Sequence, residues 1–151
     1  MPLRVAVQMD PIEPIDISAD STFRIMEEAQ ARGHPLFTYT PDHLAFDEGR
    51  VTATGWPVTL RREIGNHATK GPRGTISLAD WDVVWLRQDP PFDMGYITTT
   101  HLLDMVHPDT LVVNDPFWVR NFPEKLLVLD FPQLTPPTTI ARDLATLKAI
   151  K

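Results

Sequence analysis

The sequence has no cysteine, little basic charge and no long apolar run. The absence of cysteine among its 151 residues excludes disulfide bonds and thiolate metal sites. Lysine and arginine total 14 against 20 acidic residues, and this net charge of −6 argues against nucleic acid and anionic membranes as general partners. No apolar run approaches the roughly 20 residues of a membrane-spanning helix, and the N-terminal MPLRVAVQMD lacks the pattern of a signal peptide. We expect a soluble, cytoplasmic protein.

Glycine is also scarce, with 7 residues, and none of them belongs to a recognisable phosphate-binding loop. The run QMDPIEP after the first apolar segment lacks the G-x-G-x-x-G pattern, and KGPRGT (70–75) is no Walker loop because its lysine comes first. The five histidines show no metal-ligand spacing and are expected mostly at the surface or at sheet edges. We therefore predict no metal site in this chain.

Proline, in contrast, is abundant. The 15 prolines are about twice the average frequency of ~5%, and they stand at the ends of apolar segments rather than in a polar tail. Each fixes a backbone angle close to the end of an expected helix or strand. The sequence therefore predicts stiff loops around a packed core.

Apolar runs and helical patterns alternate along the chain. Strands are predicted over four segments: 3–9, 35–40, 81–87 and 111–114. The first helix is expected to open at Asp20 or Ser21 and to close at Gly33, and a second covers about 95–106. This order predicts an α/β fold with an open, mostly parallel, Rossmann-like sheet and flanking helices.

Two stretches depart from this alternation. Residues 41–80 are predicted to be an insertion, with a β-hairpin around Gly49 followed by an exposed loop over 61–75. Residues 115–130 suggest helix with a break at Pro123, 137–142 suggest a last strand, and Asp143 is expected to cap a final helix.

Polar or charged residues follow three of the predicted strands. They are Asp10 after the first strand, Arg87, Asp89 and Asp93 in the segment RQDPPFD after the third, and Asn114 and Asp115 after the fourth. Ligands of open α/β sheets bind at the carboxyl ends of the strands, so these residues are expected on one edge. An arginine can grip a carboxylate and aspartates can accept hydrogen bonds from an ammonium group, which suits an amino-acid-like ligand. For any single loop, ordinary turn formation or helix capping is the competing interpretation.

Seven dispersed segments resemble prokaryotic glutathione synthetase, in order and from end to end of the chain. They are VQMDPI, DSTF, EEAQARGH, WLRQDPPFD, VVNDP, EKL and LTPPT. Gln88 departs from the lysine that is usual in the family. Members of the family are about twice as long, and the resemblance implies that this chain is the N-terminal, pre-ATP-grasp portion. It implies a substrate-binding domain over 1–122 and, over 123–151, the start of an ATP-grasp region whose remainder is absent.

The resemblance also implies an activity. The family is an ATP-grasp ligase of glutathione biosynthesis, which joins γ-glutamylcysteine to glycine through an acyl phosphate with ATP and Mg²⁺. Its pattern places Lys125 at the nucleotide phosphates. We assign Asp10, Ser21, Arg87, Asp89 and Asp93 to the dipeptide side, with no catalytic residue in this chain. The isolated chain is expected to be inactive and to bind neither cofactor.

Two other classes of protein remain open. A non-catalytic α/β module for binding or oligomerisation is compatible with the chain, as is assembly into homo-oligomers. A receiver-like signalling domain has a similar sheet, but it requires an acidic pair after the first strand, where Asp10 is followed by Pro11.

Overall fold

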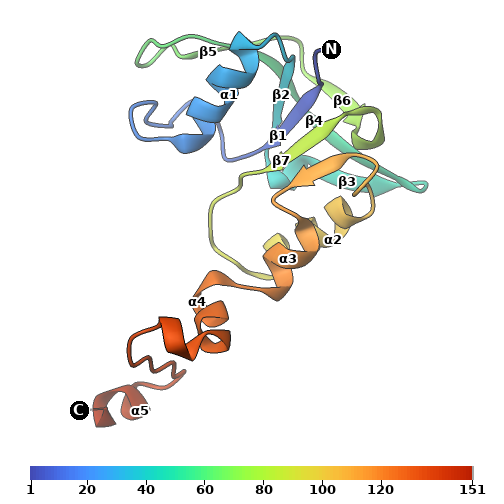
Figure 1. The fold of residues 1–151 in the computed structure, drawn as a ribbon. Coiled ribbons are helices and arrows are strands. Elements are labelled where there is room, and N and C mark those ends of the chain that lie inside the picture. Colours follow the sequence, from blue (N-terminus) through green and yellow to red (C-terminus); the bar gives the residue numbers. More distant parts are fainter. Residues whose placement is uncertain (151) are drawn as a thin grey trace. The chain divides into compact units, whose positions relative to one another are not determined.

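A computed structural model describes residues 1–150, with the exception of the Glu124 side chain. The chain divides into two compact units, Met1–Asn121 and Phe122–Lys151. The first unit contains the whole sheet (Figure 1).

Four parallel strands form the centre of the first unit. Strand β1 (Val5–Gln8) lies between β2 (Leu36–Tyr39) and β7 (Val83–Leu86), and β8 (Leu111–Val113) pairs with the far side of β7 (Figure 1). All four residues of β1 are buried, as expected for a strand that is covered on both faces. The predicted α/β fold with an open sheet is confirmed.

Helices cover the two faces of this sheet separately. Phe23 and Met26 of α1 (Ser21–Ala31) share an apolar cluster with Val5 and Val7. Leu103 of α2 (Met94–Asp104) belongs to a second cluster, which contains Ala6 and Val84. Since successive residues of a strand point to opposite faces, α1 covers one face of the sheet and α2 the other.

The ends of α1 follow from its flanking residues. Asp20 is the N-cap: its backbone is extended and its carboxylate accepts a hydrogen bond from the Phe23 amide at 2.6 Å. Of the two predicted caps Asp20 is therefore correct, and Ser21 is the first helical residue. Gly33 has a φ of 81°, the left-handed conformation in which glycine commonly ends a helix.

The predicted hairpin is present and continues the main sheet. Strand β3 (Leu44–Asp47) and β4 (Arg50–Leu60) pair antiparallel around a turn in which Glu48 and Gly49 both have positive φ. β4 then pairs antiparallel with β2, which places the residues after the hairpin at the edge of the parallel strands.

The prediction of an exposed loop over 61–75 was wrong in part. Two short strands, β5 (Ala68–Lys70) and β6 (Gly74–Ser77), both pair with β4. His67 is the one buried histidine among the described residues, and its Nε2 lies 2.6 Å from the Ile12 carbonyl oxygen. This contact ties the start of β5 to the loop between β1 and α1.

The remaining elements are short helices. Helix α3 (Pro116–Asn121) ends the first unit, and the second contains α4 (Glu124–Leu127), the 3-10 turns Val128–Asp130 and Pro132–Leu134, and α5 (Leu144–Ala149). The break at Pro123 is confirmed, as is Asp143, whose carboxylate caps α5 at 2.8 Å from the Thr146 amide.

The predicted strand over 137–142 was wrong. This segment has no regular structure and is mostly exposed. A proline has no amide hydrogen to donate to a neighbouring strand, so Pro137, which opens the segment, and Pro136 before it weaken any pairing there.

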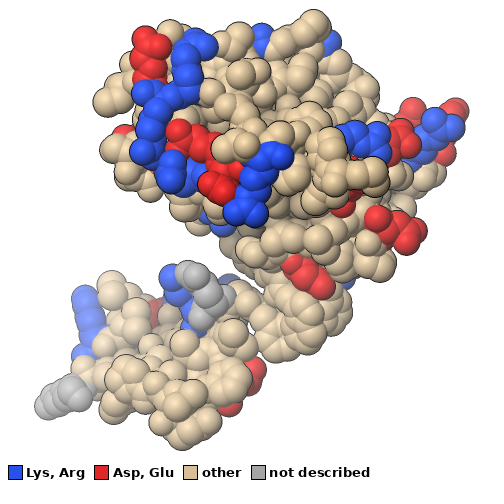
Figure 2. Space-filling view, turned by 45° about the horizontal axis from the view of Figure 1, so that its top comes forward, with Lys and Arg blue, Asp and Glu red and all other residues tan. Residues whose placement is uncertain are grey.

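Charges of both signs intermingle on the surface (Figure 2). Ion pairs form within α1 and between α1 and the segment after β4, for example Arg24 with Glu27 at 2.5 Å and Arg62 with Glu27 at 3.3 Å.

Within residues 1–150, every helix is too short or too polar to cross a membrane.

Gly55 of β4 provides a test of this sheet. A Cβ atom there would lie 2.1 Å from the Thr38 carbonyl oxygen and 2.9 Å from the Phe37 ring, both in β2. We expect Gly55→Ala to lower the free energy of unfolding by about 2 kcal/mol or more, because backbone must move to admit the methyl group. Urea denaturation followed by circular dichroism measures the change.

Gly74→Ala is the matched control in the neighbouring strand β6. Nothing lies within 4 Å of a Cβ atom at this position, so the midpoint should change little. Equal midpoints for the two variants would contradict the close approach of β4 to β2.

Candidate functional site

The carboxyl ends of the parallel strands form one rim of the sheet. The Arg87 amide donates to the Gln8 carbonyl at 2.8 Å, and the Met9 amide donates to the Tyr39 carbonyl at 3.1 Å. These bonds bring the segments after β1, β2 and β7 side by side. β8 is parallel to β7, so Asn114 and Asp115 leave the sheet at the same edge. The expected convergence of the three charged segments on one edge is observed.

The direction in which successive parallel strands are added to the sheet reverses between β1 and β7. From β1 the chain passes through α1 on one face to β2, and from β7 it passes through α2 on the opposite face to β8. Such a switch point leaves a crevice at the carboxyl ends of the two strands, where open α/β sheets bind ligands. Asp10, Arg87 and Asp89 flank this point.

Arg87 reaches from β7 to the first turn of α1. Its Nε donates to Thr22 Oγ1 and its Nη2 to Ser21 Oγ, both at 3.0 Å. The structure thus brings together Arg87 and Ser21, two of the predicted site residues. The side chain is half-buried and held by these hydroxyl groups rather than extended into open space. The two bonds use two of the five N–H donors of a guanidinium group.

Asp10 and Asp89 lie close enough to influence each other. Partial burial raises the pKa of the Asp10 carboxyl above its usual range, and repulsion from the Asp89 carboxylate raises it further. Both residues are exposed at the rim, where a cation placed between them would relieve the repulsion. The pair therefore suits the ammonium group of a ligand.

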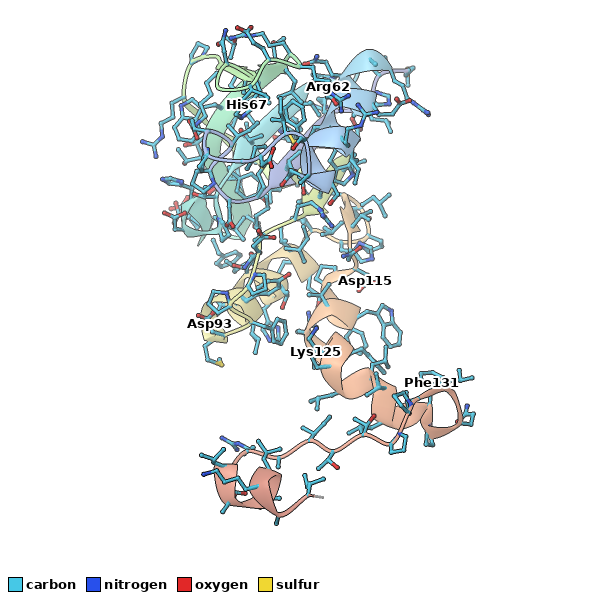
Figure 3. All side chains as sticks on the ribbon, turned by 90° about the vertical axis from the view of Figure 1, so that its left-hand side faces the viewer. Arg62, His67, Asp93, Asp115, Lys125 and Phe131 are labelled. Carbon is cyan, nitrogen blue, oxygen red and sulfur yellow. The ribbon has the colours of Figure 1, made fainter. Side chains whose placement is uncertain are left out.

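Asp93 has a defined structural contact. Its carboxylate accepts a hydrogen bond from the Tyr96 amide at 3.0 Å and caps α2. Asp115 acts in the same way at α3, where it accepts from the Phe117 amide at 2.9 Å (Figure 3). For these two aspartates the geometry supports helix capping, the competing interpretation of the sequence.

Tyr96 and Gln8, two residues of the rim, were missed from the sequence. Burial raises the pKa of Tyr96, the positive charge of Arg87 lowers it and the negative charge of Asp89 raises it, so the Tyr96 hydroxyl lies within electrostatic reach of both side chains. Gln8 is fully buried and donates through Nε2 to Gln88 Oε1 at 2.6 Å, although 80 residues separate the two. Its own Oε1 has no hydrogen-bond partner among the described residues. In the sequence, the contact between Gln8 and Gln88 was indicated only by the position of both residues at strand ends.

The described side chains contain no group of three or more histidine or acidic residues that could hold a metal. The loop from Met9 to Asp20 has no glycine, so it lacks the close backbone approach of a phosphate cradle. Lys125, exposed on α4 in the second unit, has the chemistry for a contact with phosphate (Figure 3).

Known proteins resemble this chain over most of its length. The family described as "Prokaryotic glutathione synthetase, N-terminal domain" matches residues 3–120. A protein of Bradyrhizobium diazoefficiens named "Glutathione synthetase" is 55% identical over 151 residues, which are 100% of this chain and 48% of that protein. Proteins of the same name from Brucella melitensis and Xanthomonas axonopodis are 54% and 40% identical, over 95% and 99% of this chain and 46% and 48% of their own lengths.

The chain thus spans about half the length of the curated relatives it matches. The family match covers nearly the whole first unit, including the strands of the sheet, Arg87 and the two aspartates of the rim. On this evidence the chain belongs to the prokaryotic glutathione synthetase N-terminal domain family.

Proposed function

We propose that this chain is the dipeptide-binding part of an ATP-dependent ligase that joins γ-glutamylcysteine to glycine. The observation that carries the proposal is the match over residues 3–120 together with relatives named glutathione synthetase. Residues 1–122 form the substrate-binding domain in this proposal, and 123–151 begin the ATP-grasp region. The partners are the two substrates and the remaining ATP-grasp domain, and the compartment is the cytoplasm.

ATP and Mg²⁺ would supply the activation of the cysteinyl carboxylate as an acyl phosphate, with ADP as the leaving group. The glycine amine then attacks the carbonyl carbon, phosphate leaves as the C–O bond breaks, and the amine loses a proton. Water must be kept from the activated carboxyl group, and charge must be compensated around it. For this reaction, the binding domain must position charged groups, and it needs no residue that transfers protons.

The rim has charges suited to that task. Arg87, fixed by Ser21 and Thr22, presents its remaining donors to a dipeptide carboxylate. Asp10 and Asp89 attract an ammonium group because each raises the energy of the other's charge. Asp93 caps α2 and so fixes the segment that joins Asp89 to this helix. Lys125 contacts the nucleotide phosphates in this proposal.

A non-catalytic module for binding or oligomerisation is the second candidate. An apolar hollow of about 590 Å³ beside α1 and β8 favours it, since Leu111 and Val113 are 49% and 40% exposed there. Light scattering of the chain across a range of concentrations measures self-association.

Residues 1–151 should fold but form no glutathione from γ-glutamylcysteine, glycine and Mg-ATP, because the described residues offer no metal cluster for phosphoryl transfer. Chromatographic assay of glutathione and ADP measures this. Formation of glutathione by this chain alone would refute the proposal that phosphoryl transfer requires the remaining ATP-grasp domain.

Arg87→Lys in the full-length protein should raise the KM for γ-glutamylcysteine about 10-fold and leave that for ATP nearly unchanged. Lysine keeps the charge but loses the planar fork that bonds Ser21 and Thr22 while it faces the ligand. Arg50→Lys, at an exposed position of β4, is the matched control. Equal kinetics for both variants would remove Arg87 from the dipeptide site.

Lys125→Met should raise the KM for ATP about 10-fold in the full-length protein and affect the KM for glycine much less. Loss of the ammonium group removes one cation from the nucleotide phosphates. Lys148→Met, in α5, controls for the loss of an exposed lysine. A larger effect on glycine than on ATP would assign Lys125 elsewhere.

A further inference from the structure

A polar hollow lies beside the rim, on the side of β2 and β4. It has a volume of about 350 Å³ and is lined by side chains from four separate segments. Asp10 comes from the loop after β1, and Thr40, Asp42 and His43 come from the 3-10 turn after β2. Trp56 comes from β4 and Lys70 from β5. Because Asp10 belongs to both, the hollow is continuous with the rim.

Trp56 forms a fixed wall of this hollow. The Lys70 ammonium lies 4.0 Å from the centre of the indole ring, and the Arg73 guanidinium lies 5.5 Å from it. The His43 ring meets the indole edge-on, with 6.3 Å between the ring centroids. Cations attracted to an aromatic face stay near it, so the wall also positions the positive charge.

The hollow is lined by charges of both signs. Asp42 is negative, since the hydrogen bond from the Thr40 hydroxyl holds the pKa of its carboxyl below the usual range. Asp10 adds a second carboxylate, which burial and Asp89 make costly to ionise without a cation nearby. Lys70 supplies the positive charge; the Trp56 ring positions it, and it also forms an ion pair with Glu13.

An α-amino-acid headgroup has the matching pair of charges. Its ammonium would lie against Asp10, the carboxylate that the hollow shares with the rim, with Asp42 as a further acidic neighbour. Its carboxylate would accept hydrogen bonds from Lys70, which carries three donors and shares one with Glu13. A neutral or purely anionic group would leave one of these charges uncompensated. The hollow therefore favours a zwitterion.

We infer that this hollow binds the headgroup of an α-amino acid, and that its occupant is the γ-glutamyl end of the dipeptide. The inference rests on the proposed function. γ-Glutamylcysteine carries two carboxylates, and the structure offers two cations, Lys70 in the lining of the hollow and Arg87 at the rim. Glycine carries the same headgroup but only one carboxylate, so it would use one of the two cations.

Lys70→Met in the full-length protein tests this assignment. The KM for γ-glutamylcysteine should rise about 10-fold or more, because a charge-assisted contact to the ligand is lost, while those for glycine and ATP change less than about twofold. Glu13→Gln breaks the same ion pair and keeps Lys70, so its KM for the dipeptide should stay within about threefold of the unmodified protein.

Two outcomes would overturn the inference. Equal increases for Lys70→Met and Glu13→Gln would mean that Lys70 matters only through its ion pair. An increase confined to the KM for glycine would give the hollow to the other substrate. Lys148→Met controls for the loss of a lysine charge, and urea denaturation of each variant shows that the fold is retained.

Direct binding separates this inference from the proposed function. The Trp56 indole signal of the 151-residue chain, identified with Trp56→Phe, should shift in NMR spectra on addition of L-glutamate. The shift should be lost in Lys70→Met and persist in Glu13→Gln. If the full-length protein makes no glutathione, the proposed function fails, and this titration still decides the chemistry of the hollow. An unmodified chain whose Trp56 signal ignores L-glutamate and γ-glutamylcysteine would overturn the inference.

Discussion

The burial of β1 on both faces and both edges is the constraint on which this molecule depends. Its residues contribute to two separate apolar clusters, and its backbone bonds β2 on one side and β7 on the other. A strand in this position has no contact with water along its length, so its polar loop must emerge at the end. The start of that loop, at Asp10, lies beside the segment that leaves β7. The charged residues of the rim are thus brought together by the burial of β1 between β2 and β7.

β4 extends that arrangement beyond the parallel strands. It pairs with β2, β3, β5 and β6, and it can approach β2 because Gly55 has no side chain. The same strand carries Trp56, the next residue, into the hollow beside the rim. One close backbone contact therefore serves both the continuity of the sheet and the placement of an aromatic wall.

Local signals in the sequence predicted most of this fold. Continuous apolar runs identified the four parallel strands, and Asp20, Gly33 and Asp143 marked helix ends correctly. β5 and β6 were missed because three or four mostly polar residues carry no periodicity, and their pairing depends on β4. The hydrogen bonds of Arg87 to Ser21 and Thr22 span about 65 positions, so no local pattern could reveal them. For Asp93, the sequence allowed both a ligand contact and a helix cap, and the hydrogen bond to the Tyr96 amide in the structure favours the cap.

The contacts of β5 with the loop between β1 and α1 have a consequence for affinity. His67 meets the Ile12 carbonyl, and Lys70 pairs with Glu13, so two neighbouring residues of that loop are held from outside. A tethered loop has already lost much of its conformational freedom when the molecule folds. A ligand that binds against this loop contacts a preorganised surface. Its binding therefore loses little free energy to the ordering of the loop.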